Sequence, residues 1–359
     1  MNKAIIILPT DSTIFTSWIK SKVEKKFSNI VIFFVDQHLH LSKEGMIKKI
    51  NEIINENKIS AGFFQGDYLS LIDYDFISSV KLNNKYFYLT DDFDMHEINT
   101  HTALACDGIL SCCPISVLRY KEKGLNAHFI FHESDERIFK NLNIEKDIDV
   151  LFFGALKANR AKYINKLKDS SINFKVVGPA YEDGNMVNNE ELNNYINRSK
   201  VVINFSSTGN KNKFYSHITY PFNYLYPKGR IMISGLCGTL CVSEYAPAHN
   251  IIFSKDTLLE FRNPAEMIEK IQNILVNDQE LKNKTKKFEQ ECQFYSDSKY
   301  FNKTFEKMAS NSHLLKVSKF PFWYVRAFSL KSIRLYGKSK FLRSYVPVSY
   351  THLTLPTKA

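Results

Sequence analysis

The sequence predicts an α/β fold of two Rossmann-like, doubly wound domains with a C-terminal helical tail. Short apolar runs alternate with stretches of helical spacing, and the alternation starts again after a polar linker. The length of 359 residues also matches two domains of roughly 150 residues each. Apolar residues make up 44% and charged residues 24% of the chain, which are globular proportions.

Strands that alternate with helices are typical of parallel sheets with helices on both faces. In the first half, strands are expected at 4–8, 30–35, 61–64, 85–89, 108–110 and 127–131, and helices at 13–27, 44–57 and 114–123. In the second half, strands are expected at 147–153, 173–177, 200–205 and 239–242, and helices at 159–168, 190–198, 229–237, 264–276, 278–291 and 296–312. Ligands of such sheets bind at the carboxyl ends of the strands.

The predicted domains are 1–142 and 147–295, followed by a basic helical tail at 296–348. Residues 349–359 resemble a translated sequencing-adapter read-through, and we expect them to be an artefact. The net charge is +11, and most of it comes from the Lys and Arg residues within 313–359, a segment without acids. The body is therefore close to neutral, which argues against a nucleic-acid-binding surface within the fold.

The tail mixes its cations with aromatic residues such as Trp323 and Tyr324. This composition suits peripheral contact with the anionic inner face of a membrane. It equally suits a helix that packs back onto the N-terminal domain with a solvated basic face. The six cysteines form no pair of CxxC units, so we expect reduced thiols in a cytoplasmic protein. No apolar run approaches the roughly 18 residues that span a bilayer.

Several enzyme classes are excluded by missing motifs. The first strand is followed by Pro9-Thr-Asp-Ser12 rather than GxGxxG, which argues against a nicotinamide or flavin site. GxxxxGK[ST], GxSxG and HExxH are absent as well. We expect no cofactor and no metal.

The strongest local signal is Lys228-Gly229-Arg230 at the start of an expected helix. Unpaired N–H groups and the positive end of the dipole make a helix N-terminus suitable for anions. Lys228 and Arg230 would add charge-assisted hydrogen bonds to a diphosphate. The alternative is a basic surface turn before an ordinary core helix.

Other polar or glycine positions follow the strands of the second half. Gly154 ends the first of these strands, and Arg160 begins the next helix, where it either reaches a phosphate or is solvated. Ser206 and Ser207 follow the strand at 200–205. Their hydroxyls and N–H groups suit a phosphate, although small polar residues are also common in plain loops.

The stretch from 148 to 290 resembles the C-terminal domain of GT-B glycosyltransferases, in particular the CgeB-like group related to the group 1 transferases. The order of the matching segments carries the resemblance: Gly154 with Arg160, 176–178, 201–207, Arg230 with 238–242, and 251–271. The resemblance implies a nucleotide-diphosphate sugar donor bound by the C-terminal domain and an acceptor bound by the N-terminal domain. By position, Lys228 and Arg230 would contact the diphosphate, and Gly154, Ser206 and Ser207 would line the nucleotide site.

The sequence departs from this group at two carboxylates. Related retaining transferases place Glu residues where this chain has Leu225 and Ile233. Glu244 is a substitute polar contact in our interpretation. A remodelled or inactive donor site is the alternative.

Asp91, Asp92 and His96 follow a strand of the first domain and are our candidates for the base that deprotonates an acceptor hydroxyl. Asp92-x-Asp94 also matches the metal-binding DxD pattern of GT-A transferases. The structural alternative is an aspartate that caps a short helix.

The sequence therefore predicts a metal-independent glycosyltransferase that uses a nucleotide-sugar donor and a glycan, lipid-linked or protein acceptor. A non-catalytic sugar-nucleotide-binding protein on the same fold and a metal-dependent GT-A-like enzyme using Asp92 and Asp94 are the alternatives.

Overall fold

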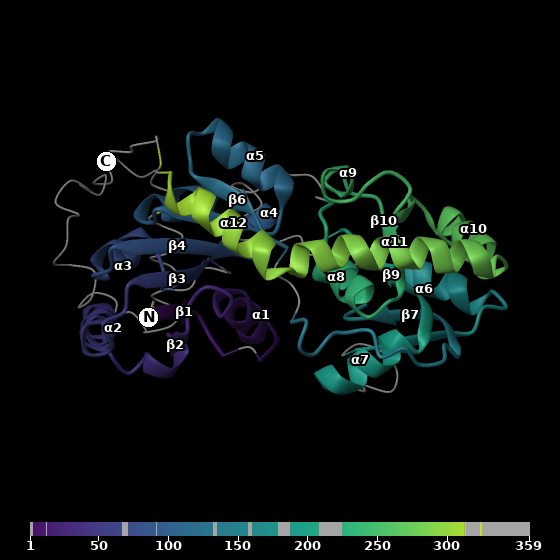
Figure 1. The fold of residues 1–359 in the computed structure, drawn as a ribbon, viewed down its shortest axis with the longest axis horizontal. Helices are drawn as coiled ribbons and strands as arrows, with labels where there is room; N and C mark the ends of the chain where they lie inside the picture. Colours follow the sequence, from purple (N-terminus) through teal and green to yellow (C-terminus); the bar gives the residue numbers. More distant parts are fainter. Residues whose placement is uncertain are drawn as a thin grey trace, which may run out of the picture.

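The computed structural model describes residues 3–11, 13–66, 71–90, 92–131, 135–156, 160–178, 187–207, 225–311, 313 and 324. These residues form two lobes that lie side by side (Figure 1). Each lobe is built around one parallel sheet, with six strands in the N-terminal lobe and five in the C-terminal lobe among the described residues. The predicted pair of doubly wound domains is confirmed.

The N-terminal sheet has the strand order β2-β1-β3-β4-β5-β6, and all of its pairs are parallel. Its strands are β1 (Lys3–Leu8), β2 (Asn29–Phe34), β3 (Ala61–Gly66), β4 (Asn84–Leu89), β5 (Gly108–Ser111) and β6 (Ala127–Phe129). The chain adds β2 on one side of β1 and then crosses to β3 on the other side. The two sheet faces must therefore both be covered by helices.

Side-chain alternation along β1 divides the N-terminal core into two layers. Ile5 and Ile7 pack with α2 (Lys43–Asn57), α3 (Tyr74–Ser79) and α5 (Pro114–Glu122). Ala4, Ile6 and Leu8 face the opposite way and pack with α1 (Thr13–Val23) and α12 (Ser298–Ala309). Because β1 is buried on both faces, it reads as one continuous apolar run.

The C-terminal sheet has the order β11-β10-β9-β7-β8, again with parallel pairs. Its strands are β7 (Ile148–Phe153), β8 (Phe174–Val177), β9 (Ser199–Asn204), β10 (Leu240–Glu244) and β11 (Leu259–Phe261). The chain passes from β7 to β8 and then returns across β7 to β9. The topological switch point therefore lies between the carboxyl ends of β7 and β9, where open α/β sheets bind their ligands.

Helices cover both faces of this sheet. One core contains side chains of α6 (Arg160–Lys168), α8 (Gly229–Leu236), α10 (Pro264–Leu275) and α11 (Asp278–Ser296). The other contains side chains of α7 (Asn189–Asn197) and the opposite side of α8. A short helix, α9 (His249–Ile252), follows β10.

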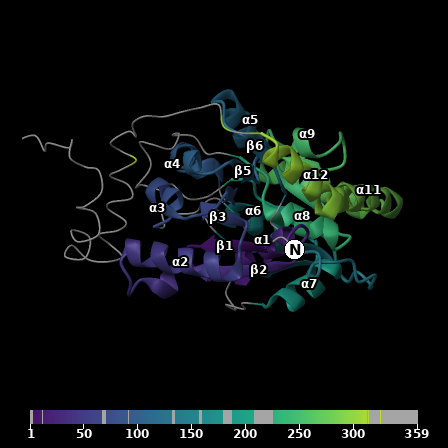
Figure 2. The ribbon, with the colours of Figure 1, turned by 60° about the vertical axis from the view of Figure 1, so that its left-hand side comes forward.

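The end of the described chain joins the two lobes. In both views, α11 runs along the C-terminal lobe and α12 continues onto the N-terminal lobe (Figure 1, Figure 2). Phe301, Phe305 and Met308 of α12 are buried in the N-terminal core. The helix predicted at 296–312 is therefore present, and it packs on the N-terminal domain.

A second connection lies at the linker between the sheets. Trp18 of α1 packs with Phe139 of the linker and with Phe153 and Ile233 of the C-terminal lobe. Lys22, also in α1, is buried and donates to Glu136 of the linker at 3.1 Å. Burial lowers the pKa of Lys22, and the attraction of Glu136 partly opposes this shift.

Most of the tail predicted after residue 312 lies outside the described residues. At Tyr324 the side chain is buried, and its hydroxyl accepts from Tyr74 N at 3.1 Å and lies 2.9 Å from Thr102 Oγ1. Packing onto the N-terminal lobe is thus the arrangement at this position. No helix among the described residues is long and apolar enough to cross a membrane.

The helices α3 and α9 and the strand β11 were not expected from the sequence. The helix α4 (Asp92–Thr102) was foreseen only as the short helix of the structural alternative at Asp91 and Asp92. α4 carries Asp, His, Asn and Thr in place of a clear apolar stripe, which explains why its period was missed. β11 has three residues and α9 has four, too few to show a period.

Replacing Phe305 with alanine is expected to lower the free energy of unfolding by about 3–5 kcal/mol, the usual cost of deleting a buried Phe side chain. Phe305 is 6% exposed and packs edge-on against Phe27 and Tyr86. Phe294→Ala in α11 is the matched control, because Phe294 is 59% exposed. Urea denaturation of both variants measures the difference. Equal losses would contradict the packing of α12 on the N-terminal sheet.

Candidate functional site

Arg230 occupies the switch point of the C-terminal sheet. It is the second residue of α8, and its Nε donates to Phe153 O at 2.8 Å while its Nη1 donates to Asn204 Oδ1 at 3.0 Å. Phe153 is the last residue of β7, and Asn204 is the last residue of β9. A single guanidinium therefore bridges the two strand ends between which the ligand site of this sheet class lies.

Gly154 is required by the position of Arg230. Its φ is +116°, and a Cβ at this position would lie 2.7 Å from Arg230 Nη2. Gly178, after β8, has a φ of +141°, and a Cβ there would lie 2.8 Å from Gly154 O. Only glycine combines these dihedrals with so close an approach. The backbone after β7 therefore packs tightly against the guanidinium, and the backbone after β8 packs against that of Gly154.

Arg160 is a second buried cation at the same edge. It begins α6 and donates to Ala155 O at 2.9 Å and to Ser207 O at 3.1 Å. Its Nε is buried and has no hydrogen-bond partner. Burial lowers the pKa of Arg160, while Glu244 and Tyr226 raise it. Arginine remains charged under these conditions.

Ser206, Ser207 and Glu244 tie the ends of β9 and β10 together. Ser206 Oγ donates to Glu244 O at 2.6 Å, and Ser207 N donates to Glu244 Oε2 at 2.9 Å. The Ser207 hydroxyl is buried without a hydrogen-bond partner. Glu244 is 8% exposed, so this carboxylate first of all holds the loop after β9 in place.

Lys228 completes the site as the N-cap residue of α8. Its side chain makes no capping hydrogen bond. Its Nζ instead lies 3.4 Å from the centroid of the Tyr226 ring. The structure thus brings all seven predicted donor-site positions to one edge of the C-terminal sheet. The three cations outnumber the single carboxylate, and together with the N-terminus of an eight-residue helix they favour an anionic ligand there.

Asp92 lies inside the N-terminal lobe, at the start of α4. It is 1% exposed, and its carboxylate accepts from Asn99 Nδ2 at 3.1 Å, Ser111 Oγ at 2.5 Å and the Tyr120 hydroxyl at 2.5 Å. Burial raises the pKa of Asp92, and these hydrogen bonds partly oppose the shift. The contacts connect α4 with β5 and α5, so this carboxylate has a clear architectural function. Its predicted part in catalysis stays a prediction.

His96 lies one helical turn further along α4. Its ring packs on Tyr120 with centroids 4.2 Å apart, and both ring nitrogens are buried without a hydrogen-bond partner. Burial, together with nearby Arg119 and Lys123, lowers the pKa of His96 to about 2. The imidazole is therefore neutral at physiological pH. Asp91 and the side chain of Asp94 lie outside the described residues.

The polar clusters of the two lobes approach each other where the lobes meet. Tyr226 packs against Cys113 at the start of α5. Cys113 N donates to Ser111 Oγ at 3.2 Å, and Ser111 in turn donates to Asp92. The start of α8 therefore lies beside the carboxyl end of the N-terminal strand β5.

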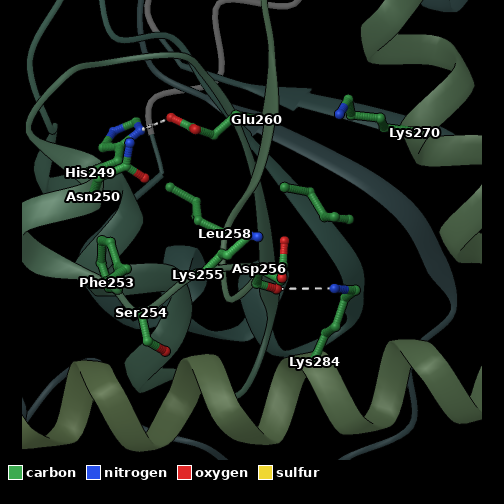
Figure 3. Close-up of a pocket in the computed structure, with 11 residues that line it drawn as sticks. His249, Asn250, Phe253, Ser254, Lys255, Asp256, Leu258, Glu260, Lys270 and Lys284 are labelled. Carbon is green, nitrogen blue, oxygen red and sulfur yellow. Dashed lines mark hydrogen bonds and ion pairs between the residues drawn. The ribbon is translucent and has the colours of Figure 1, made fainter.

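A separate cavity of about 240 Å³ lies in the C-terminal lobe (Figure 3). It is bounded by α9, β11, α10 and α11, and His249 in its wall pairs with Glu260 at 2.7 Å. None of the predicted donor residues lines this cavity. We place the functional site at the switch point, because there the strand ends, two glycines and three cations converge.

Leu225 and Ile233, which stand where related retaining transferases carry Glu, both make contacts that support the fold. Ile233 is buried on the side of α8 that packs with Trp18 and Phe139. Leu225 forms an isolated antiparallel bridge with Ser207. Ile233 therefore belongs to the contact between lobes and is not available to a ligand.

Sequence reasoning missed several residues of the site. Asn204 and Tyr226 contact the cations, and Ser111 and Tyr120 bind Asp92. Asn204 and Ser111 were detectable as polar residues that end buried strands. Tyr226 could not be identified from the sequence, because a single tyrosine before a basic turn does not differ from an ordinary loop residue.

Residues 159–301 match the family model "Glycosyl transferase-like". A search of curated proteins found no match. Among solved structures, the chain is similar to a sucrose-phosphate synthase from Thermosynechococcus elongatus, at 7% identity and a TM-score of 0.56, over 86% of this chain and 98% of that one. It is also similar to Anabaena HepE in complex with UDP and glucose, at 10% identity and a TM-score of 0.57, over 86% and 99%.

T4 phage BGT, solved with UDP and Mn²⁺, is similar at 13% identity and a TM-score of 0.51, over 85% of this chain and 99% of that one. The fold is GT-B. The C-terminal lobe of this GT-B protein is glycosyl transferase-like in sequence, as the resemblance implied. The narrower CgeB-like assignment stays a prediction. The GT-A-like alternative is wrong, because its architecture does not contain two such lobes.

Asp92→Asn tests the buried carboxyl of the N-terminal lobe. Its folded-state pKa is raised, so the stability that it contributes is present below its unfolded pKa of about 4. That contribution is lost as the pH rises through the folded pKa. In acid, we expect the free energy of unfolding of the variant to be lower than that of the wild type by about 1–3 kcal/mol, because one hydrogen-bond acceptor is lost. This difference should shrink as the pH rises. Urea denaturation at a series of pH values measures this difference. If the free energies of unfolding of the two proteins ran parallel over the whole pH range, the raised pKa would be contradicted.

Proposed function

We propose that this chain is a glycosyltransferase that moves a sugar from a nucleotide-diphosphate sugar to an acceptor hydroxyl. The observation that carries the proposal is Arg230, which bridges the ends of β7 and β9 at the first turn of α8. The GT-B fold and the family match over 159–301 support it. UDP, which is bound in the similar structures of HepE and BGT, is the nucleotide that we propose to test first.

In the proposed reaction, the bond between the sugar C1 and the β-phosphate oxygen breaks, and its electron pair leaves with the nucleoside diphosphate. The acceptor oxygen forms the new bond to C1. Lys228, Arg230 and the N–H groups at the start of α8 would stabilise the charge that develops on the diphosphate. Arg160 would add to the positive potential, while its Nη donors hold Ala155 O and Ser207 O.

The proton of the acceptor hydroxyl requires a base in an inverting reaction. We retain Asp91, Asp92 and His96 as the candidates. Asp92 already accepts from three side chains, so its replacement should affect stability as well as turnover. The neutral His96 ring has two nitrogens without hydrogen-bond partners. His96→Gln is therefore the variant that separates a catalytic role from the packing of the Asp92 cluster.

We also propose that the reaction needs no resident metal, because Arg160, Lys228 and Arg230 supply positive charge at the strand ends. Among the described residues, no group of three or more His, Cys, Asp and Glu residues is placed to hold a metal ion. The acceptor is a glycan, a lipid-linked glycan or a protein in this proposal. We further propose a cytoplasmic enzyme whose basic tail contacts the membrane surface.

A non-catalytic sugar-nucleotide-binding protein is the second candidate. Ile233 and Leu225 favour this second candidate, because related retaining transferases carry carboxylates at these two positions. In this chain, Ile233 is a buried core residue and Leu225 forms a β-bridge with Ser207. Such a protein would bind the donor without hydrolysing or transferring the sugar. Turnover of the donor decides between the two candidates.

Lys228→Met is expected to weaken UDP binding by about 10- to 100-fold, since a charge-assisted hydrogen bond is worth roughly 1.5–3 kcal/mol. Arg230→Lys keeps the charge but cannot bridge Phe153 O and Asn204 Oδ1, so turnover of UDP-glucose should fall further. Calorimetry and release of UDP measure the two effects. Lys200→Met is the control, because Lys200 pairs with Asp149 at the opposite end of the sheet. Unchanged binding in Lys228→Met would contradict the proposed site.

Treatment with a chelator tests the absence of a metal requirement. The proposal predicts equal rates of UDP release before and after incubation with EDTA followed by desalting. Restoration by Mn²⁺ or Mg²⁺ of a lost activity would show a metal-dependent transferase. In that case Asp92 and Asp94, the residues of the DxD pattern, would be the first candidate ligands to replace.

A further inference from the structure

Tyr226 is the side chain through which the two lobes meet at the start of α8. It is 1% exposed and packs with the buried Cys113 and the partly buried Ile115 of the N-terminal lobe. Cys113 is the N-cap residue of α5, and Ile115 follows in its first turn. The ring of Tyr226, two residues before Lys228, therefore presses against the beginning of an N-terminal helix.

The same ring holds the lysine of the proposed donor site. Lys228 Nζ lies 3.4 Å from the ring centroid. The negative face of an aromatic ring attracts a cation, more strongly where water is excluded. Tyr226 N donates to Ser206 O at 3.2 Å, which fixes the backbone below the ring to the loop after β9. One residue thus contacts the other lobe, the strand end and the cation.

The other two cations of the site are held differently. Arg160 donates to Ala155 O and Ser207 O within its own lobe. The third, Arg230, is held by Phe153 O and Asn204 Oδ1 within its own lobe. Lys228 is accordingly the cation whose position depends on a side chain that the other lobe supports.

We propose that Tyr226 is a positioning residue that makes the placement of Lys228, and hence binding of the donor diphosphate, depend on contact between the lobes. The inference rests on the proposed function, because its ligand is the diphosphate of the nucleotide donor. Cys113 and Ile115 support the ring, and the supported ring keeps Lys228 Nζ at the start of α8. By linkage, the bound diphosphate stabilises the contact between the lobes by the same free energy.

The test uses the full chain and four variants. UDP binding is measured by calorimetry, and the ε-methylene signal of Lys228 is followed by NMR without ligand, since the Tyr226 ring shifts this signal. Tyr226→Phe retains the ring, and Tyr226→Leu removes it. Cys113→Ala removes support from the N-terminal side. Cys112→Ala is the matched control, because Cys112 is also buried but donates to Thr90 O and lies outside the Tyr226 contact.

We expect Tyr226→Phe and Cys112→Ala to retain the affinity for UDP and the shifted Lys228 signal. Tyr226→Leu should bind UDP about tenfold more weakly, and Cys113→Ala about threefold more weakly, each with loss of the shift. Wild-type affinity and signal in Cys113→Ala would overturn the coupling between the lobes, even where Tyr226→Leu fails to fold. If the full chain binds neither UDP nor UDP-glucose, the proposed function fails. The Lys228 signal in the variants then still shows whether Tyr226 and Cys113 position Lys228.

Discussion

The site depends on one bridging guanidinium. Arg230 closes the gap between the ends of β7 and β9, and its two acceptors are a strand-end carbonyl and the amide of Asn204. Gly154 packs against this guanidinium, Gly178 packs against the backbone of Gly154, and the positive φ of both residues disfavours any larger side chain. The cation is therefore built into the sheet edge before any ligand arrives. In the proposed reaction, such preorganisation would let it stabilise the departing diphosphate without rearrangement.

The second constraint is the way in which the two lobes are joined. The linker is held to α1 by the pair of Lys22 and Glu136, and α12 carries the chain back to the N-terminal core. These connections bring the carboxyl end of β5 next to the start of α8, where Tyr226 and Cys113 touch. A donor bound at the start of α8 and an acceptor bound by the N-terminal lobe would then lie close together at this contact. The polar cluster around Asp92 lies directly behind this contact.

The architecture was largely predictable from the sequence. Ala4–Leu8 and 150–153 are continuous apolar runs, as is typical of buried parallel strands, and the structure places β1 and β7 there. The short elements α3, α9 and β11 were missed, because they have too few residues to show a period. Within the site, Lys228, Arg230 and Gly154 were identified because helix starts and strand ends have recognisable residue types.

Other parts of the site depend on tertiary contacts that no local pattern contains. Asp92 looked like an exposed base in the sequence but is enclosed by Ser111 and Tyr120, which are distant along the chain. Tyr226 acquires its role only because the other lobe packs against it. The pair of the buried His249 and the partly exposed Glu260, in the wall of the separate cavity, was likewise not indicated by the sequence.

A crystal structure of the full chain with UDP tests the central claim most directly. The account predicts that the diphosphate lies against the first turn of α8, within hydrogen-bond distance of Lys228 or of the N–H groups at 229–230. A diphosphate bound in the cavity between α9, α10 and α11, or at any site away from the ends of β7 and β9, would contradict it.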